Sequence, residues 1–233
     1  MPVDTKSDVA FRIEAIASKD ALAASWREVE RRGDGAFFTS WTWIGTWLGT
    51  LPTEIEPCLI RATRGGETVA LAVAVFRQAR RHIFVHTRQL HFNSTGDPRY
   101  DAIAIEHNDF AGERGLLPAF VAWFHDADCA DELVVPGASP DGVPATPGLL
   151  LSMRKVPAFA RDKLDIVVRD GIGAVLSRNA RQHISRNIRD LSRFGALRVE
   201  EAATPGEALA YFEALKDLHI RSWTRRGKRH AAA

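Results

Sequence analysis

The chain has 233 residues, of which 45% are hydrophobic and 26% are charged, and its formal net charge is +2 at pH 7. A chain of this length and apolar content can bury a sizeable core, so it fits one large or two small domains and excludes a disordered protein. No window approaches the roughly 20 uninterrupted apolar residues of a membrane-spanning helix, and residues 1–8 lack the basic-then-apolar order of a signal peptide. We therefore expect a cytoplasmic protein.

The cysteines and the charge distribution limit the kinds of functional site that the sequence predicts. Cys58 and Cys129 stand alone without a CxxC partner, which predicts buried structural thiols and neither a disulfide framework nor a metal site. Residues 1–169 contain 19 Lys/Arg and 22 Asp/Glu, whereas residues 170–233 contain 12 and 7. A local basic excess of this kind is typical of a surface that binds phosphate or an acidic polymer, although solvated helix faces produce it too.

The first predicted elements are a strand and two helices. Residues 9–16 alternate between apolar and polar side chains and predict a strand. Ser18 is the expected N-cap of a helix over residues 19–32, which Gly33 ends. Ser40 can cap a second helix, in which Trp43, Trp47 and Leu48 share one face. The tryptophans of this helix could stack on a sugar, but packing in the core is the plainer interpretation.

The next segment predicts an antiparallel meander. Three strands are expected over residues 58–63, 67–77 and 83–92, with Arg64-Gly65-Gly66 as a hairpin turn. Residues 93–98 have the composition of a loop. The elements expected after it are a strand over 100–105, a helix over 110–126, a strand over 132–135, a loop over 137–148 and a strand over 149–156.

The last part of the chain is dominated by two predicted helices. A strand over 165–168 leads into a helix over 174–194, which Gly195 ends, and a short strand is expected over 197–200. Thr204 and Pro205 begin a final helix that runs to about Arg225. The order of elements indicates an α+β or mixed α/β fold, with one domain over 1–164 and another over 165–233.

Two stretches resemble a known family. The first is Phe37-Phe38-Thr39-Ser40-Trp41-Thr42-Trp43, continued to Trp47, and the second is the basic segment 177–189, followed by Gly195 and by His219-Ile220-Arg221-Ser222-Trp223-Thr224-Arg225-Arg226-Gly227. Both are similar to segments of the acetyltransferase-like proteins from bacterial cellulose and exopolysaccharide clusters, a branch of the GNAT-type N-acyltransferases.

The resemblance implies an acyl-CoA N-acyltransferase fold, with one N-terminal GNAT-like domain and the start of a second. It also implies relatedness to the transferases that add amino acids to peptidoglycan precursors. Such chains usually continue past the basic helix, whereas this sequence stops at Lys228-Arg229-His230-Ala231-Ala232-Ala233. The expectation is therefore an incomplete second domain and a chain whose activity as a transferase is in question.

A GNAT site holds the donor pyrophosphate with backbone N–H groups at a strand-to-helix turn, where a helix N-terminus offers unpaired donors. The closest segment here is 169–174, in which Gly171 and Gly173 are the candidate cofactor-binding residues and Ile172 replaces a glycine. A linker in which Asp170 caps the next helix is the plainer interpretation.

The predicted helix over 174–194 separates apolar residues from a row of arginines at 100° per residue. Arginine suits phosphate and carboxylate groups, so the row can bind a CoA phosphate, an acidic glycan or nucleic acid. A solvated face paired with nearby acids is as good an interpretation. The candidate donor-binding arginines are Arg178, Arg181, Arg186 and Arg189.

Acyl transfer to an amine needs a base and donors for the oxyanion. Polar residues around the end of the predicted third strand can supply a base and an acid, although turn chemistry and core packing account for each of them singly. These candidates are His91, Asp97, Tyr100 and Asp101. On the last helix, the resemblance adds His219 as a catalytic candidate and Arg221 and Trp223 as substrate-binding candidates.

The sequence thus predicts a transferase that moves an acyl group from acetyl-CoA or another acyl-CoA to an unknown amine or hydroxyl, without a metal, in envelope or exopolysaccharide assembly. A non-catalytic GNAT-like module that binds an anionic partner is the alternative. Nucleic-acid binding is the least favoured, because no helix-turn-helix and no aromatic-basic interleaving accompany the arginines.

Overall fold

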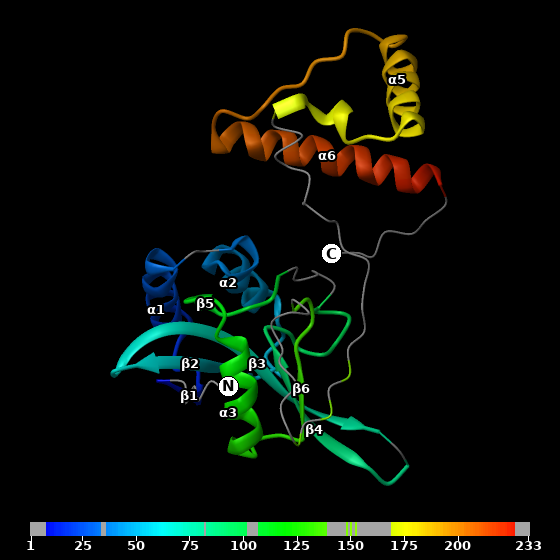
Figure 1. The fold of residues 1–233 in the computed structure, drawn as a ribbon. Helices are drawn as coiled ribbons and strands as arrows, with labels where there is room; N and C mark the ends of the chain where they lie inside the picture. Colours follow the sequence, from blue (N-terminus) through cyan, green and yellow to red (C-terminus); the bar gives the residue numbers. More distant parts are fainter. Residues whose placement is uncertain are drawn as a thin grey trace. The chain divides into compact units, whose positions relative to one another are not determined.

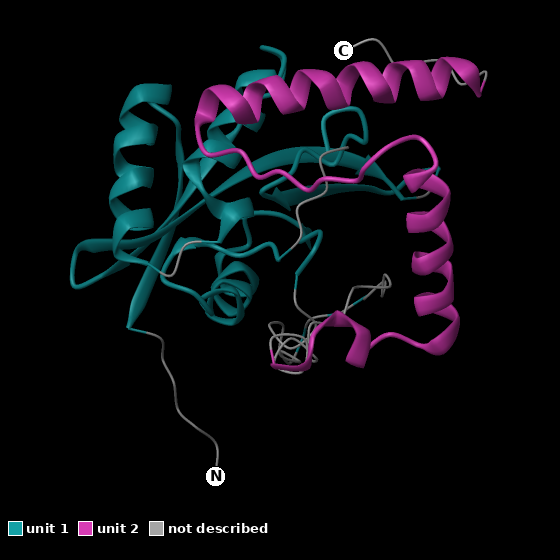
Figure 2. Ribbon diagram, turned by 90° about the horizontal axis from the view of Figure 1, so that it is seen from above, with its two compact units in different colours: residues 1–153 teal, residues 154–233 magenta. Residues whose placement is uncertain are grey.

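The computed structural model describes residues 8–33, 36–81, 83–101, 107–138, 148, 150, 152 and 169–226. The chain divides into two compact units, residues 1–153 and 154–233 (Figure 2). The sheet lies in unit 1, and the basic helix predicted from the sequence lies in unit 2. Each unit is therefore described by itself.

A six-stranded sheet forms the centre of unit 1 (Figure 1). Its order is β1-β2-β3-β4-β6, and β5 pairs with β3. All of these pairings are antiparallel except β4 with β6, which is parallel. The bounds are β1 Val9–Ala15, β2 Cys58–Arg64, β3 Glu67–Arg80, β4 His86–Phe92, β5 Ala111–Gly112 and β6 Glu132–Val134. The fold of unit 1 is accordingly α+β with a mostly antiparallel sheet, as the order of elements predicts.

Helices cover both faces of this sheet. The side chains of β3 alternate between the two faces, so neighbouring residues of this strand enter different hydrophobic clusters. Ala70, Ala72 and Ala74 pack in a cluster with α3 (Leu117–Ala127), whereas Leu71 and Val73 pack in a cluster with the first two helices. Successive side chains of a strand point to opposite faces, so the middle of β3 is buried on both sides. Unit 1 is therefore a three-layer structure with β3 at its centre.

The helices α1 (Lys19–Arg32) and α2 (Trp41–Thr50) begin where the sequence predicts. Ser18 accepts a hydrogen bond from the N–H of Ala21, and Ser40 accepts one from the N–H of Trp43. Between the helices lies the short 3-10 helix η1 (Phe37–Thr39). Trp47 is buried and donates from Nε1 to the carbonyl of Tyr100 at 3.1 Å, so it packs in the core as the plainer interpretation holds.

Helix α3 begins seven residues later than the sequence predicts. The expected start at Phe110 is wrong because Gly112 and Gly115 adopt positive φ angles of 93° and 76°, which a right-handed helix excludes. Gly112 belongs instead to the short strand β5. Pro118 lies in the first turn of α3, where the missing N–H has no cost.

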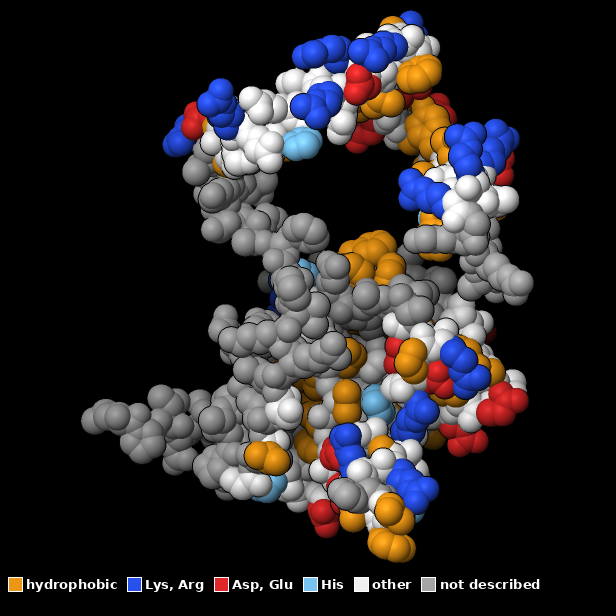
Figure 3. All heavy atoms as spheres, turned by 90° about the vertical axis from the view of Figure 1, so that its right-hand side faces the viewer, with side chains coloured by type: hydrophobic (Ala, Val, Ile, Leu, Met, Phe, Trp, Pro, Cys, Tyr) orange, Lys and Arg blue, Asp and Glu red, His pale blue; other side chains and the backbone are white. Residues whose placement is uncertain are grey.

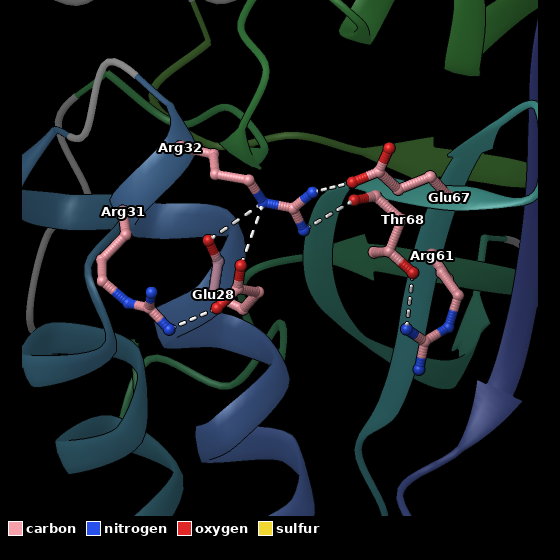
Figure 4. A network of polar contacts seen from close by, with 6 residues as sticks. All are labelled: Glu28, Arg31, Arg32, Arg61, Glu67 and Thr68. Carbon is pink, nitrogen blue, oxygen red and sulfur yellow. Dashed lines mark hydrogen bonds and ion pairs between the residues drawn. The ribbon is translucent and has the colours of Figure 1, made fainter.

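An ionic network connects α1 to the hairpin of β2 and β3 (Figure 4). Arg32 at the end of α1 forms an ion pair with Glu67 and donates to the carbonyl of Thr68 at 3.3 Å. On the same hairpin, Arg61 donates to the hydroxyl of Thr68 at 3.0 Å and pairs with Glu14 of β1 at 2.7 Å. These pairs are partly exposed, so each adds little to the stability of the fold.

In the β3–β4 hairpin, β3 ends three residues later than predicted and β4 begins three residues later than predicted. β3 continues to Arg80, which pairs with His86, so the predicted start of the next strand at Ile83 is wrong. The N–H of Arg81 donates to the carbonyl of Val85 at 2.9 Å, which places Ile83 in the connecting turn. The turn at Arg64-Gly65-Gly66 is confirmed.

Unit 2 contains the 3-10 helix η3 (Ile172–Ala174) and the helices α5 (Arg178–Ser192) and α6 (Pro205–Arg225). The predicted start of the basic helix at Ala174 is wrong, because Ser177 caps α5 by accepting from the N–H of Ala180 at 3.2 Å. The start of α6 after Thr204 is confirmed. The strand predicted over 197–200 is wrong, because no described strand pairs with these residues.

Three other predictions fall wholly or mostly on residues outside the described ranges. They are the strands over 100–105, 149–156 and 165–168. The same holds for most of the loop predicted over 137–148.

Candidate functional site

Buried polar side chains of unit 1 gather at the carboxyl end of β4. Among the described residues, seven polar side chains are buried, and all but Thr39 lie in β4, in the loop after it or in the segment that leads to β5. We refer to these six as the β4-end cluster. Its members are Gln89, His91, Asn93, Ser94, Thr95 and Asn108. Because buried polar groups must be hydrogen-bonded, such a concentration marks either a specific structural joint or a site.

Two asparagines hold the chain where it leaves the sheet. Asn93, with a φ of 48°, accepts from the N–H of Val73 at 2.9 Å and donates to the side chain of Asn108 at 2.8 Å. Asn108 in turn donates to the carbonyls of Phe92 at 3.1 Å and Pro136 at 2.9 Å. The end of β4 is therefore fixed to β3 on one side and to the segment after β6 on the other.

His91 lies within the cluster, with one edge of its ring against Gly96. A Cβ atom built on Gly96 would lie 2.3 Å from Cε1 of the imidazole and 2.7 Å from Nδ1, and the backbone of Gly96 has a φ of 72°. Only glycine satisfies both conditions. Burial lowers the pKa of His91 below its ordinary value of 6.5, with the nearby Asp101 carboxylate acting in the opposite direction, so the imidazole is neutral at pH 7.

The parallel pairing of β4 with β6 places Gln89 opposite Glu132. Gln89 donates from Nε2 to a carboxylate oxygen of Glu132 at 2.7 Å, and its Oε1 lies 3.0 Å from Nε2 of His91. Arg81 holds the other side of Glu132, with Nε at 2.7 Å from Oε1. The hydrogen bond from Arg81 is the main reason that the pKa of Glu132 falls to about 2. Glu132 is therefore ionised over the whole working range of pH.

Asp101, another predicted site residue, binds the loop that follows β4. Its carboxylate accepts from the N–H of Thr95 at 2.8 Å, from the hydroxyl of Thr95 at 2.9 Å and from the N–H of Gly96 at 2.6 Å. His91 and Asp101 thus both meet at Gly96, as their proximity in the sequence suggests. The same contacts mean that the carboxylate already occupies two backbone donors that an anion or an oxyanion would need.

The other two candidates of this loop have different partners. Asp97 pairs with Arg99 at 2.7 Å, and this hydrogen bond lowers the pKa of Asp97 to about 2. Tyr100 accepts from the indole of Trp47 through its carbonyl, and Arg99 lies over its ring at 5.3 Å. The contacts of both residues lie in the turn after β4 and away from the imidazole of His91.

In unit 2, the predicted donor-binding arginines lie on one face of α5. They line a shallow depression of about 440 Å³ together with Gln182 and Ser185; the arginines are Arg178, Arg181, Arg186 and Arg189. We call this surface the arginine face. Within residues 169–226, the ion pair on α5 is that of Arg193 with Asp190, one turn after Arg189 on the same side of the helix. Figure 3 shows Lys and Arg side chains at the surface of this part of the molecule.

In the predicted phosphate loop before α5, a backbone N–H group already donates to another residue of the same loop. The N–H of Ala174 donates to the carbonyl of Gly171 at 3.1 Å, and Gly173 accepts through its carbonyl from Arg181 at 3.0 Å. Gly171 has a φ of 79°. The helix opens only after Ser177, so the glycines form a turn that precedes the helix N-terminus instead of leading directly into it.

The candidates on α6 stand on adjacent turns of one helix. The rings of His219 and Trp223 are 4.9 Å apart and tilted by 37°, as expected for residues at positions i and i+4. Arg221 is exposed on the same helix. The structure therefore brings His219 and Trp223 together, within α6 itself.

Sequence reasoning missed Gln89, Glu132, Gly96 and the asparagine pair. A signal for part of the cluster was present, because Gln89, His91 and Asn93 recur every second residue and alternate with the apolar Leu90 and Phe92. Glu132 had no such signal, since it reaches Gln89 only through the parallel pairing of β6 with β4.

Among the described residues, neither the cysteines nor a metal-binding group adds a further reactive centre. Both thiols are half-buried, and burial raises the pKa of Cys58 to about 11, so this thiol stays protonated at pH 7. In the part of the chain that the structure describes, no group of three or more His, Cys, Asp or Glu side chains is placed to hold a metal ion. None of the helices found there combines the length and apolar character that crossing a bilayer requires.

Comparison of the chain with protein-family models, with curated proteins and with solved structures finds no match. The function must therefore be inferred from the chemistry of the β4-end cluster and of the arginine face.

Proposed function

We propose that the protein is a GNAT-type N-acyltransferase that takes an acyl group from acetyl-CoA or another acyl-CoA, in envelope or exopolysaccharide assembly. The observation that carries this proposal is His91, a neutral imidazole inside a buried polar cluster at the carboxyl end of β4. A neutral imidazole can accept the proton that an amine loses when it attacks a thioester carbonyl. The class of fold and the resemblance of segments 37–47, 177–189 and 219–227 support the same activity.

In this reaction the amine nitrogen forms a bond to the acyl carbon, and the carbon–sulfur bond breaks. The proton passes from the amine nitrogen to His91 and from there to the departing thiolate, so that the products are an amide and free CoA. No covalent enzyme intermediate is required. The arginine face offers four guanidinium groups of the kind that bind the phosphates of CoA.

Isothermal titration of the full chain with acetyl-CoA and with desulfo-CoA tests donor binding. We expect micromolar binding that weakens at least tenfold in the double variant Arg181→Ala, Arg186→Ala. Arg198→Ala is the control, because it removes an exposed arginine of unit 2 that lies outside α5. Absence of heat from a protein with a native circular dichroism spectrum would contradict the proposal, and so would equal weakening by the control.

One observation favours a second function, that of a non-catalytic module that binds an anionic polymer. Asp101 already occupies the N–H groups of Thr95 and Gly96, and the arginine face is formed by one helix alone. A linear polyanion needs only such a stripe, whereas a small ligand usually needs a concave pocket. Retention on heparin at 0.3 M salt or above, lost in the double arginine variant and kept in Arg198→Ala, would favour this function if CoA does not bind.

A further inference from the structure

The hydrogen bonds around Gln89 leave a single assignment of donors and acceptors. Glu132 is ionised and can only accept, so the side-chain group of Gln89 that faces it at 2.7 Å must be the NH₂ group. The carbonyl oxygen of Gln89 therefore faces His91. Because that oxygen can only accept, Nε2 of His91, 3.0 Å away, must carry the proton.

We propose that Gln89 and Glu132 are positioning residues that hold His91 in the Nε2-protonated tautomer, so that Nδ1 is the atom that accepts the proton in the transfer. This inference rests on the proposed function as far as the transfer is concerned. The tautomer itself follows from the contacts between β4 and β6 and can be measured without any substrate. A histidine whose second nitrogen donates to a fixed acceptor has its ring orientation and its basic nitrogen defined together.

Burial and orientation support the assignment. Gln89 and His91 are 7% and 6% exposed, so bulk water competes little with their hydrogen bond. Arg81 holds Glu132 through two nitrogens, which keeps the carboxylate in place to orient the amide of Gln89. The chain of contacts thus runs from Arg81 through Glu132 and Gln89 to the imidazole.

The charges around the imidazole fit a proton acceptor. A Cβ atom built on Gly96 would lie 2.3 Å from Cε1, 2.5 Å from Nε2 and 2.7 Å from Nδ1 of His91, so only a residue without a side chain fits against the ring. The charged groups that act on the imidazole are Asp101 from the loop after β4, Arg77 from β3 and Glu132 from β6. Asp101 and Glu132 favour the imidazolium that forms when Nδ1 takes a proton, whereas Arg77 and burial oppose it. The ring is therefore neutral at rest and has two carboxylates to stabilise the transient cation.

The test is nitrogen NMR of the full chain with ¹⁵N-labelled histidine, from pH 5 to 9. The chain has eight histidines, and the His91 signals are identified by their loss in His91→Gln. We expect a protonated Nε2 and an unprotonated Nδ1 at pH 8. A protonated Nδ1, or equal populations of the two tautomers, would overturn the proposal.

Variants at position 89 separate positioning from mere packing. Gln89→Glu places a carboxylate against Nε2, so we expect the titration midpoint of His91 to rise by at least one pH unit while the Nε2-protonated form persists. Gln89→Leu removes the acceptor, so we expect the two tautomers to become mixed. Glu132→Gln keeps an oxygen that can accept from Gln89, and we expect it to preserve the tautomer. Unchanged tautomers in Gln89→Leu would overturn the proposal.

Activity distinguishes this inference from the proposed function. If the tautomer is as expected and no acyl transfer to any amine is found, the proposed function fails and the positioning of His91 stands. If transfer occurs, we expect the acidic limb of its pH profile to move to higher pH in Gln89→Glu, in step with the titration of His91. Transfer with an unmoved acidic limb would contradict the assignment of His91 as the base.

Discussion

At the scale of single residues, the contact between Gly96 and His91 places two constraints on one position. The glycine must both adopt a positive φ and leave space for an imidazole ring. Gly65, in the hairpin turn between β2 and β3, also has a positive φ, of 58°, but no atom lies within 4 Å of a Cβ built on it. A comparison of substitutions at the two glycines therefore separates the cost of a positive φ from the cost of steric overlap with His91.

We expect Gly96→Ala to lower the free energy of unfolding by about 3 kcal/mol, and Gly65→Ala by only about 1 kcal/mol, since both bear the strain of a left-handed residue and only the first displaces a ring. Urea denaturation of both variants measures the difference. Equal losses would show that His91 moves away from Gly96 at little cost.

The titration of His91 gives a second prediction at this scale. Its folded pKa lies below the ordinary 6.5, so the unfolded chain binds more protons than the folded chain between these two values. Above pH 6.5 the titration of His91 does not lower the free energy of unfolding. As the pH falls from 6.5 to the folded pKa, the unfolded chain takes up the extra proton and the free energy of unfolding decreases. We expect His91→Gln to flatten the fall in unfolding free energy between pH 6.5 and 5, measured by denaturation at each pH. The acids Asp97 and Glu132, whose pKa values are about 2, lose their contributions only below pH 4.5.

At the scale of elements, the asparagine pair joins three segments of unit 1. Asn93 binds β3 through the N–H of Val73, and Asn108 binds the end of β4 and the segment after β6. Both asparagine side chains are buried. If one partner of a hydrogen bond is removed, the polar group that remains has no water to bond in its place. The joint is the reason that the β4-end cluster stays ordered where the sheet ends.

We expect Asn108→Ala to lower the free energy of unfolding by about 3 kcal/mol, because it removes three hydrogen bonds, to the carbonyls of Phe92 and Pro136 and from the amide of Asn93. Gln78→Ala, on an exposed position of β3, is the control and should change it by less than about 0.5 kcal/mol. Chemical denaturation followed by tryptophan fluorescence measures both. A similar small loss in both variants would mean that water replaces the asparagine bonds.

At the scale of the whole molecule, the two units differ in how their apolar side chains are placed. Unit 1 buries two clusters, one on each face of the sheet. In α5 and α6 no residue is buried, and apolar side chains such as Ile188, Phe212 and Leu215 are more than half exposed. Helices of this kind gain little stability from packing.

We expect the stability of unit 1 to depend on its own two clusters. Leu71→Ala should lower its free energy of unfolding by about 3 kcal/mol, since Leu71 is fully buried, whereas Leu215→Ala on α6 should leave it within about 0.5 kcal/mol. Amide hydrogen exchange provides the second measurement, with faster exchange expected in α5 and α6 than in β2 to β4. A large effect of Leu215→Ala would show that α6 contributes to the core of unit 1.

Local signals in the sequence were sufficient for elements whose ends depend on nearby residues. Ser18 and Gly33 delimit α1, Thr204 begins α6, and the Gly65-Gly66 pair turns the chain between β2 and β3, because caps and turns are decided by contacts over three or four residues. The arginine face follows in the same way from helical periodicity. The start of α3 failed where Gly112 and Gly115 adopt positive φ angles, a choice that glycine permits without requiring it.

The sequence by itself thus determined the class of fold, the bounds of α1 and the grouping of the arginines on α5. It also singled out His91 as a candidate base. Only the tertiary structure decided that Glu132, 43 positions after Gln89 along the chain, lies opposite it and that Gly96 lies against the imidazole. The physical reason is that a parallel pair such as β4 and β6 joins distant segments through a register that no local pattern encodes, so the partners that fix the tautomer of His91 are visible only once the sheet is formed.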